Sequence, residues 1–259
     1  MLNHATIDHL RSLRLEGFAA ALEEQLAQPN AHAMSFEERL GLLVDRELNT
    51  RNDRKQTRLL QKAHLKYPRA AIEDIDSRAG RGIDRKTFMS LALSQWIERG
   101  DTILLTGPTG LGKTWLACAL GQYACRRGFS TAYLRVPRLA EELRVMHGSG
   151  GFGKWLIALA KTEVVILDDW GLTNLDAATR ADLLEIVDDR ATQKATIITT
   201  QLPVDHWHAW IGDATIADAI LDRIMQRMHR VDLTGPSMRD HEIDAPAKKT
   251  AKAGGKSAT

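Results

Sequence analysis

The stretch Gly107-Pro108-Thr109-Gly110-Leu111-Gly112-Lys113-Thr114 matches the pattern G-x-x-x-x-G-K-[ST] completely. A β-rich run, Thr102-Ile103-Leu104-Leu105, comes directly before it, and a helical run begins at Trp115. Glycines at these positions let the backbone wrap closely around phosphates, with N–H groups pointing inward at a helix start. The stretch therefore predicts a P-loop that binds a nucleoside triphosphate. A chance glycine-rich turn is the alternative, and the flanking strand and helix argue against it.

Each part of this loop has an expected role. Lys113 supplies positive charge to the β- and γ-phosphates, which makes it a catalytic candidate, and the Thr114 hydroxyl ligates Mg²⁺. We therefore expect ATP and Mg²⁺ as cofactors. The residues expected to contact ATP are Gly107, Pro108, Thr109, Gly110, Leu111, Gly112, Lys113, Thr114 and Trp115.

Two carboxylates follow a second apolar run. Val164-Val165-Ile166-Leu167 precedes Asp168-Asp169, which lie 55 residues beyond Lys113. Burying carboxylates is costly unless they face a cation or water. Asp168 is therefore expected to hold Mg²⁺ together with Thr114, and Asp169 to orient or deprotonate the attacking water. A strand that simply emerges into solvent is the alternative.

Two further candidate features are a polar strand tip and two late arginines. Thr200 and Gln201 end the run Thr196–Gln201, so either can hydrogen-bond the γ-phosphate or the lytic water; ordinary strand termination is equally compatible. Arg223 is a candidate arginine finger acting in trans, and Arg239 a candidate acting in cis on ATP. Each arginine can instead be a salt-bridged surface residue.

The rhythm of the chain predicts an α/β fold. Five β-rich runs alternate with helical stretches, which favours a parallel five-stranded sheet covered on both faces, that is, three α/β/α layers. The expected strands are 101–106, 130–135, 163–168, 195–200 and 230–233.

The first part of the chain has a helical pattern instead. Ser35 and Glu38 form a capping box, apolar residues follow at helical spacing, and Tyr67-Pro68 ends the unit. We expect an all-helical accessory domain over 1–69 that binds DNA or a partner. An ATPase domain over 70–244 and a flexible basic tail over 245–259 follow it.

Composition excludes some classes. The 44% hydrophobic and 26% charged fractions are those of an ordinary globular chain. No apolar run approaches the roughly 18 residues that span a bilayer, and the N-terminus lacks a signal-peptide pattern. We expect no membrane partner. Cys118 and Cys125, seven residues apart on one helix face, favour small packing residues in a reducing compartment, hence the cytoplasm.

Positive charge is concentrated in one segment. Seven bases and one acid lie between Arg51 and Arg69, which predicts either a solvated helix face or a contact surface for the phosphates of duplex DNA. The candidate DNA contacts are Arg51, Arg54, Lys55, Arg58, Arg135, Arg138, Arg144 and Lys154. The tryptophans Trp170, Trp207 and Trp210 can stack on bases, but burial is the commoner fate.

These features in this order resemble AAA+ ATPases of the helicase-loader and initiator branch. The stretches 107–114, 166–171 and 199–203, followed by Trp207 and by Gly235-Pro236-Ser237-Met238-Arg239, are similar to IstB-type insertion-sequence transposition proteins. The resemblance implies an ATP-dependent homo-oligomer that assembles on duplex target DNA and assists a transposase. It also implies that Arg223 acts on a neighbouring subunit's ATP.

The chain departs from that family pattern in places. Asp169 stands where Glu is usual, which predicts slow turnover, and Gln201 stands where Asn is common. The chain also ends before the usual helical lid, which puts the role of Arg239 in doubt. A replicative helicase loader, a non-hydrolysing ATP-gated DNA clamp and a P-loop small-molecule kinase are the alternative functions.

Overall fold

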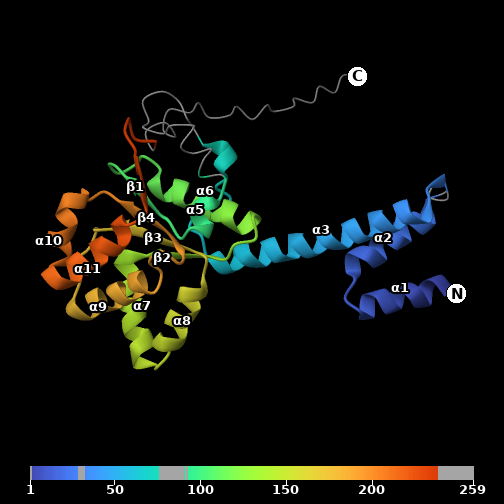
Figure 1. Cartoon of the computed structure of the whole chain (residues 1–259), viewed down its shortest axis with the longest axis horizontal. Coiled ribbons are helices and arrows are strands. Elements are labelled where there is room, and N and C mark those ends of the chain that lie inside the picture. The colour runs from blue at the N-terminus through green and yellow to red at the C-terminus, as the bar shows by residue number, and fades with distance from the viewer. Residues whose placement is uncertain (1, 29–32, 76–90, 92, 239–259) are drawn as a thin grey trace, which may run out of the picture.

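The computed structural model describes residues 2–28, 33–75, 91 and 93–238. Figure 1 shows an α/β body and a long helix, α3 (Phe36–Ala63), that projects from it. Helices α2 (Glu16–Ala27) and α1 (Leu2–Ser12) lie at the far end of α3, where α2 packs on α3 and α1 packs on α2. The expected combination of a helical N-terminal part and an α/β part is therefore present.

One parallel sheet forms the centre of the body. Its order is β2-β3-β4-β1-β5, and the bounds are β1 (Thr102–Thr106), β2 (Thr131–Arg135), β3 (Val164–Trp170), β4 (Ala195–Thr200) and β5 (Met228–Asp232). This confirms the predicted five-stranded parallel sheet. The last strand lies at 228–232 rather than 230–233, because it pairs along the whole of β1 from Met228 onward. Strand β3 continues two residues past its predicted end.

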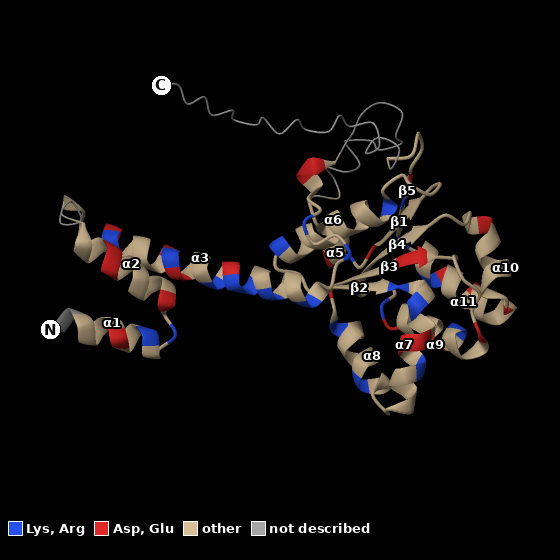
Figure 2. Cartoon of the chain, turned by 180° about the vertical axis from the view of Figure 1, so that it is seen from behind, with Lys and Arg blue, Asp and Glu red and all other residues tan. Residues whose placement is uncertain are grey.

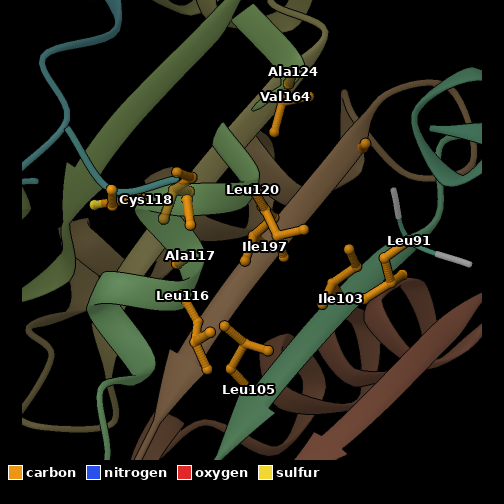
Figure 3. Close-up of a cluster of buried hydrophobic side chains, with 14 of the residues drawn as sticks. Leu91, Ile103, Leu105, Leu116, Ala117, Cys118, Leu120, Ala124, Val164 and Ile197 are labelled. Atoms are coloured by element: carbon orange, nitrogen blue, oxygen red, sulfur yellow. The ribbon is translucent and has the colours of Figure 1, made fainter. Parts of the chain in front are cut away.

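Successive residues of the inner strands enter two separate apolar cores. Ile103 and Leu105 of β1 pack in one core, and Leu104 packs in the other. The first core, part of which is shown in Figure 3, lies against α6 (Lys113–Arg126) and α5 (Gln95–Glu98). Because a strand points alternate side chains to opposite faces, both faces of the sheet are covered, which gives three layers.

The second core lies against helices and one 3-10 turn on the other face of the sheet. These elements are α7 (Val136–Gly148), α8 (Phe152–Lys161), α9 (Ala177–Asp188), α10 (Trp207–Ile211), α11 (Ala214–Met225) and η3 (Val204–His206). The other 3-10 turn, η2 (Ile72–Asp74), packs against the first core through Ile72. Among the described residues no helix is both long and apolar enough to cross a bilayer.

Both cysteines are buried in the first core. Cys118 and Cys125 are free thiols on α6, as their predicted role as packing residues requires. Burial raises the pKa of Cys118 to about 11, so this thiol stays protonated and unreactive at neutral pH.

Helix α3 begins where local chemistry predicts. The Ser35 hydroxyl accepts a hydrogen bond from the Glu38 N–H, and the Glu38 carboxylate accepts one from the Ser35 N–H, so the capping box is confirmed. The apolar pattern is interrupted over the basic run, yet α3 continues through that run. The whole helix has 28 residues and is about 42 Å long. His64, with φ of 49°, ends the helix in the left-handed conformation.

The end of α3 belongs to the core of the α/β body. Ala63 and Leu65 are buried in the first core, with Leu59 and Leu60 packed against it. Helix α3 contacts both α6 and β2. The domain limits near 69 and 244 stay predictions, and the tail over 245–259 lies outside the described residues.

Close packing of α2 on α3 at Gly17 generates a stability prediction. A Cβ at Gly17 would lie against Thr50 Oγ1 and 2.8 Å from the Arg46 carbonyl oxygen. We expect Gly17→Ala to lower the free energy of unfolding of the helical unit by about 1–3 kcal/mol, measured by denaturant unfolding followed by circular dichroism. In Gly153→Ala, where the added Cβ meets nothing within 4 Å, stability should stay equal or rise. Equal losses in both variants would contradict this packing.

Candidate nucleotide-binding site

The P-loop joins the carboxyl end of β1 to the first residue of α6. Gly107, Gly110 and Gly112 have φ of 136°, 85° and 82°, a region that other residues rarely adopt. A Cβ at Gly107 would also meet the carbonyl oxygen of Leu233. The glycine pattern is therefore required by the backbone path. That path leaves the N–H groups of the first turn of α6 available to an anion.

Lys113 is held over this loop. Its ammonium donates to the carbonyl oxygens of Gly107 and Pro108, both at 2.7 Å, and the residue is only 8% exposed. Burial lowers the pKa of Lys113 from its ordinary value, and the carboxylates of Asp169 and Asp168 partly oppose that change. The cation thus lies at the phosphate-binding turn, as the sequence predicts.

Asp168 is a fully buried carboxylate surrounded by hydroxyl groups. Its Oδ1 accepts hydrogen bonds from Thr114 and Thr199, each at 2.7 Å, and its Oδ2 accepts one from Tyr133 at 2.5 Å. The donors come from α6, β4 and β2, which all meet at the end of β3. Burial and the hydrogen bond to Asp168 raise the pKa of Tyr133 far above its ordinary value, so the phenol remains a donor.

This set of oxygen ligands fits Mg²⁺. A threonine hydroxyl and a carboxylate are in direct contact beside the P-loop, and hard cations prefer such oxygens. Within the described residues no three His, Cys, Asp or Glu side chains gather to form a metal cage. That arrangement suits Mg²⁺, which is commonly held by one or two protein oxygens together with water and substrate phosphates.

A β-bulge directs Asp169 toward the same site as Asp168. Consecutive strand residues normally point to opposite faces, but the register between β3 and β4 shifts between Leu167 and Trp170. Asp169 has φ of 61°, and its N–H donates to Thr199 Oγ1 at 3.0 Å rather than to the regular ladder. Thr199 therefore fixes the bulge and also donates to Asp168.

Arg135 fixes the Asp169 carboxylate. Its Nε lies 2.8 Å from Asp169 Oδ2, and the Asp169 side chain is 17% exposed. This hydrogen bond raises the pKa of Arg135 above its ordinary value. Arg135 was predicted as a DNA contact, but the structure places it in the nucleotide site, because β2 ends beside β3.

At the polar tip of β4 the threonine that contacts Asp168 is Thr199, not the predicted Thr200. Thr200 is 1% exposed and bonds to the Trp170 carbonyl at 2.8 Å and the Leu202 N–H at 3.0 Å, so its hydroxyl is used by the backbone. Thr199, one residue earlier, contacts Asp168 instead. Gln201 is exposed at the carboxyl end of β4. The bulge that decides which threonine faces Asp168 leaves no signal in the sequence.

The structure does not bring Arg223 to the P-loop of its own chain. Arg223 pairs with Asp188 and donates to the Ala219 carbonyl. It lines a small cavity with Gly100 and Thr102, at the amino end of β1, the opposite edge of the sheet. A role in trans stays a prediction.

Arg239 lies outside the described residues, but the segment before it reaches the P-loop. Leu233 N–H donates to the Thr106 carbonyl at 2.8 Å, and Met238 N–H donates to the Gly110 carbonyl at 2.9 Å. The chain after β5 therefore lies directly against the P-loop.

The remaining DNA candidates lie on two parts of the molecule. Arg54, Lys55 and Arg58 are exposed on α3, whereas Arg51 pairs with the buried Glu47 at 2.6 Å. Arg138, Arg144 and Lys154 are exposed on α7 and α8, and Arg144 pairs with Glu141.

The tryptophans after the carboxylates are packing residues. Trp170 and Trp207 are 1% and 0% exposed, and Trp170 packs against both Trp207 and Trp210. The expected burial is therefore confirmed for Trp170 and Trp207, and neither is available to stack on bases.

A P-loop after β1, with paired carboxylates near the carboxyl end of β3 in a parallel sheet, defines a P-loop NTPase fold. The same fold is found in the crystal structure of the DnaC helicase loader, with a TM-score of 0.55 and 19% identity over 65% of this chain and 99% of that one. It is also found in DnaI, with a TM-score of 0.55 and 21% identity over 71% and 98%. At these identities the likeness shows the fold alone.

The chain belongs to the IstB-like ATP binding protein family, whose profile matches residues 8–245. A relative from Pseudomonas fluorescens, named as an ATP-binding protein of insertion sequence IS1162, is 54% identical over 203 residues, which cover 78% of this chain and 88% of the relative. A second, from Sinorhizobium fredii and named as insertion sequence ATP-binding protein y4pL, is 46% identical over 93% and 98%. The resemblance to IstB-type proteins is thereby confirmed.

The double role of Thr199 generates a prediction for this site. Thr199→Val removes the donor to Asp168 and the acceptor for the Asp169 N–H, so we expect Mg²⁺-dependent ATP affinity to fall by roughly tenfold or more. Thr199→Ser keeps the hydroxyl and should restore most of it. Fluorescent ATP titrations at several Mg²⁺ concentrations measure this.

Thr200→Val is the matched control. It removes a buried hydroxyl that does not touch Asp168, so it should lower thermal stability with a smaller effect on Mg²⁺ dependence. If Thr199→Val binds Mg²⁺-ATP as tightly as the native protein, the proposed role of Thr199 is wrong.

Proposed function

We propose that this protein is a Mg²⁺-dependent ATPase that assembles on duplex target DNA and assists a transposase in DNA transposition. The observation that carries the ATPase proposal is the contact between Thr114 and the buried Asp168, with Asp169 turned toward the same point by a bulge. The relatives named for insertion sequences carry the transposition proposal.

In this proposal each residue at the site has one task. The backbone of Gly107–Gly112 and the Lys113 ammonium bind the phosphates, and Thr114 with Asp168 holds Mg²⁺. When bound, the metal neutralises charge that develops on the phosphates. Asp169 orients the attacking water and accepts its proton, while Gln201 hydrogen-bonds the γ-phosphate or this water.

Asp169 is expected to be a slow base. Its side chain is one methylene shorter than the Glu that is usual in AAA+ ATPases, and Arg135 holds it at 2.8 Å. Two constraints therefore limit how closely its carboxylate can approach a water at the γ-phosphate. Slow basal turnover follows.

Single-turnover ATP hydrolysis, with and without duplex DNA, tests the ATPase proposal. We expect Asp169→Asn to lower the rate by about 10²–10⁴-fold, because the amide cannot accept the proton, and Asp169→Glu to equal or exceed the native rate. Lys113→Ala should no longer retain nucleotide. Equal rates in the native, Asn and Glu forms would remove Asp169 from the chemistry. Transfer of the phosphoryl group to a small acceptor would support a kinase instead.

DNA contacts are proposed for the exposed cations of α3. Figure 2 shows Lys and Arg gathered along the half of α3 nearer the sheet. Arg58 follows Arg54 by four residues and Lys55 by three, so all three cations lie on one side of the helix. Fixed cations on a straight helix can contact successive phosphates without reading bases, which suits binding to many target sequences.

The triple variant Arg54→Gln/Lys55→Gln/Arg58→Gln tests this surface. We expect weaker duplex binding and a salt slope smaller by about 2.7, since each phosphate contact contributes about 0.9. Arg51 is left intact because it pairs with the buried Glu47. Arg14→Gln/Lys161→Gln/Arg227→Gln, which removes three exposed cations elsewhere, is the matched control. Fluorescence anisotropy from low to physiological salt measures both, and equal slopes in the two variants would relocate the surface.

Self-association on DNA completes the proposal. Arg223 is partly exposed and far from its own P-loop, so its action on ATP requires a neighbouring subunit, while Arg239 would act in cis. Sizing of the protein with ATP and duplex DNA measures assembly. A helicase loader, the alternative suggested by the shared fold, would require a helicase partner in place of the transposase.

A further inference from the structure

The segment that follows β5 packs directly on the phosphate-binding loop. Residues 233–238, here called the strap, form neither helix nor strand. Backbone hydrogen bonds run from the Leu233 N–H to the Thr106 carbonyl, at 2.8 Å, and from the Met238 N–H to the Gly110 carbonyl, at 2.9 Å. One of these bonds lies just before the P-loop and the other lies at its middle, so the strap bridges the first half of the loop.

The strap gives two of the loop glycines a second reason to be glycine. A Cβ at Gly107 would meet the Leu233 carbonyl oxygen, and a Cβ at Gly110 would meet the Ser237 hydroxyl and lie 3.0 Å from the Ser237 Cβ. Both glycines also have a left-handed φ, so they serve the path of the loop and the close approach of the strap together. Leu233 is 2% exposed in the first core, which fixes the root of the strap.

The Met238 hydrogen bond fixes the orientation of one peptide in the loop. In a trans peptide the carbonyl and the following N–H point in opposite directions, so holding the Gly110 carbonyl toward Met238 turns the Leu111 N–H away from the strap. Glycine permits this peptide to rotate, because it adopts φ of either sign at little cost. A rotated peptide would present a carbonyl oxygen where the loop has to present N–H groups to phosphate. The strap therefore opposes an orientation that is unfavourable for nucleotide binding.

The strap contacts do not depend on Lys113. The Lys113 ammonium also holds the loop, by donating to the carbonyl oxygens of Gly107 and Pro108, but in the proposed function it binds the phosphates instead. The hydrogen bonds from the strap come from backbone N–H groups outside the loop, so they can persist while nucleotide is bound. The strap can therefore hold the loop both with and without nucleotide.

We propose that the strap positions the P-loop for nucleotide, with the Met238 N–H and the Ser237 side chain as the positioning contacts. The inference deepens the proposed ATPase function and rests on it. The strap acts by preorganisation, because a loop that is already held in its binding conformation loses less freedom when nucleotide binds. The backbone N–H groups of a P-loop bind the α- and β-phosphates, so the strap acts equally on ATP and ADP, and it acts without Mg²⁺.

Met238→Pro tests the backbone contact, because proline has no N–H to donate to Gly110. We expect the dissociation constants for ATP and for ADP to rise by the same factor, about three- to tenfold, with and without Mg²⁺. The hydrolysis rate at saturating ATP should stay within about twofold of the native rate, since the contact supports binding and not the chemical step. Met238→Ala keeps the N–H and should bind both nucleotides as the native protein does. Fluorescent-nucleotide titrations and single-turnover hydrolysis measure these values.

Ser237→Leu tests the side-chain contact without introducing proline. Ser237 lies against Gly110 with no room for a larger side chain, so leucine should displace the strap and weaken ATP and ADP binding by the same factor. Ser237→Ala fits the same space and should lose less affinity than Ser237→Leu. Thermal unfolding without nucleotide identifies a temperature at which every variant is folded, and the titrations are compared there.

Hydrogen exchange supplies a readout that a purely structural strap would not move. If the strap strengthens nucleotide binding, nucleotide must strengthen docking of the strap by the same factor. We therefore expect saturating ADP to slow exchange in peptides covering residues 233–238 of the native protein by about three- to tenfold. The effect should be smaller in Met238→Pro.

The outcomes separate this inference from the ATPase proposal. Native affinity in both Met238→Pro and Ser237→Leu would overturn the positioning role of the strap. A loss of affinity that appears only with Mg²⁺ or only for ATP would also overturn it, as would exchange in residues 233–238 that ADP leaves unchanged. Retention of nucleotide by Lys113→Ala would instead overturn the nucleotide site itself.

Discussion

The carboxylate of Asp168 is the group around which the site is arranged. A fully buried charge is tolerated only where donors or a cation replace its water, and here three hydroxyls do so at 2.5–2.7 Å. Those hydroxyls belong to α6, β2 and β4, so satisfying one carboxylate fixes the relative positions of three elements. One of the donors, Thr114, is part of the P-loop. The hydrogen bond that Asp168 needs therefore also fixes the position of the nucleotide-binding loop.

The bulge in β3 follows from the same constraint. A regular strand would send Asp169 to the opposite face, away from Asp168, and the left-handed φ of 61° is the cost of turning it back. Thr199 offsets part of that cost because its hydroxyl oxygen accepts a hydrogen bond from the Asp169 N–H, while the same hydroxyl donates one to the Asp168 carboxylate. Arg135 then neutralises the second carboxylate. Two adjacent acids can therefore share one site without facing each other unpaired.

The projecting helix and the nucleotide site are mechanically connected. The last turn of α3 is buried with α6, and α6 begins with Lys113 and Thr114. A force applied to the cationic half of α3 therefore acts on the helix that carries the phosphate-binding residues. In the proposed function this packing gives DNA bound to α3 a direct structural route to the nucleotide site.

The sequence by itself determined the class of fold, the P-loop and Asp168, because each depends on local chemistry: glycines at left-handed positions, a lysine at a helix start, and acids after an apolar strand. It also determined the capping box and the five strands. It could not assign Arg135 or choose Thr199 over Thr200, because both depend on which strands are neighbours and on a shift of register between them. The exposure of the apolar residues Leu40, Val44 and Leu48 on α3 could not be predicted either, since apolar residues at helical spacing predict burial until the packing shows which side of the helix α2 covers. Only the tertiary structure decides such matters, because contacts between distant segments carry no local signal.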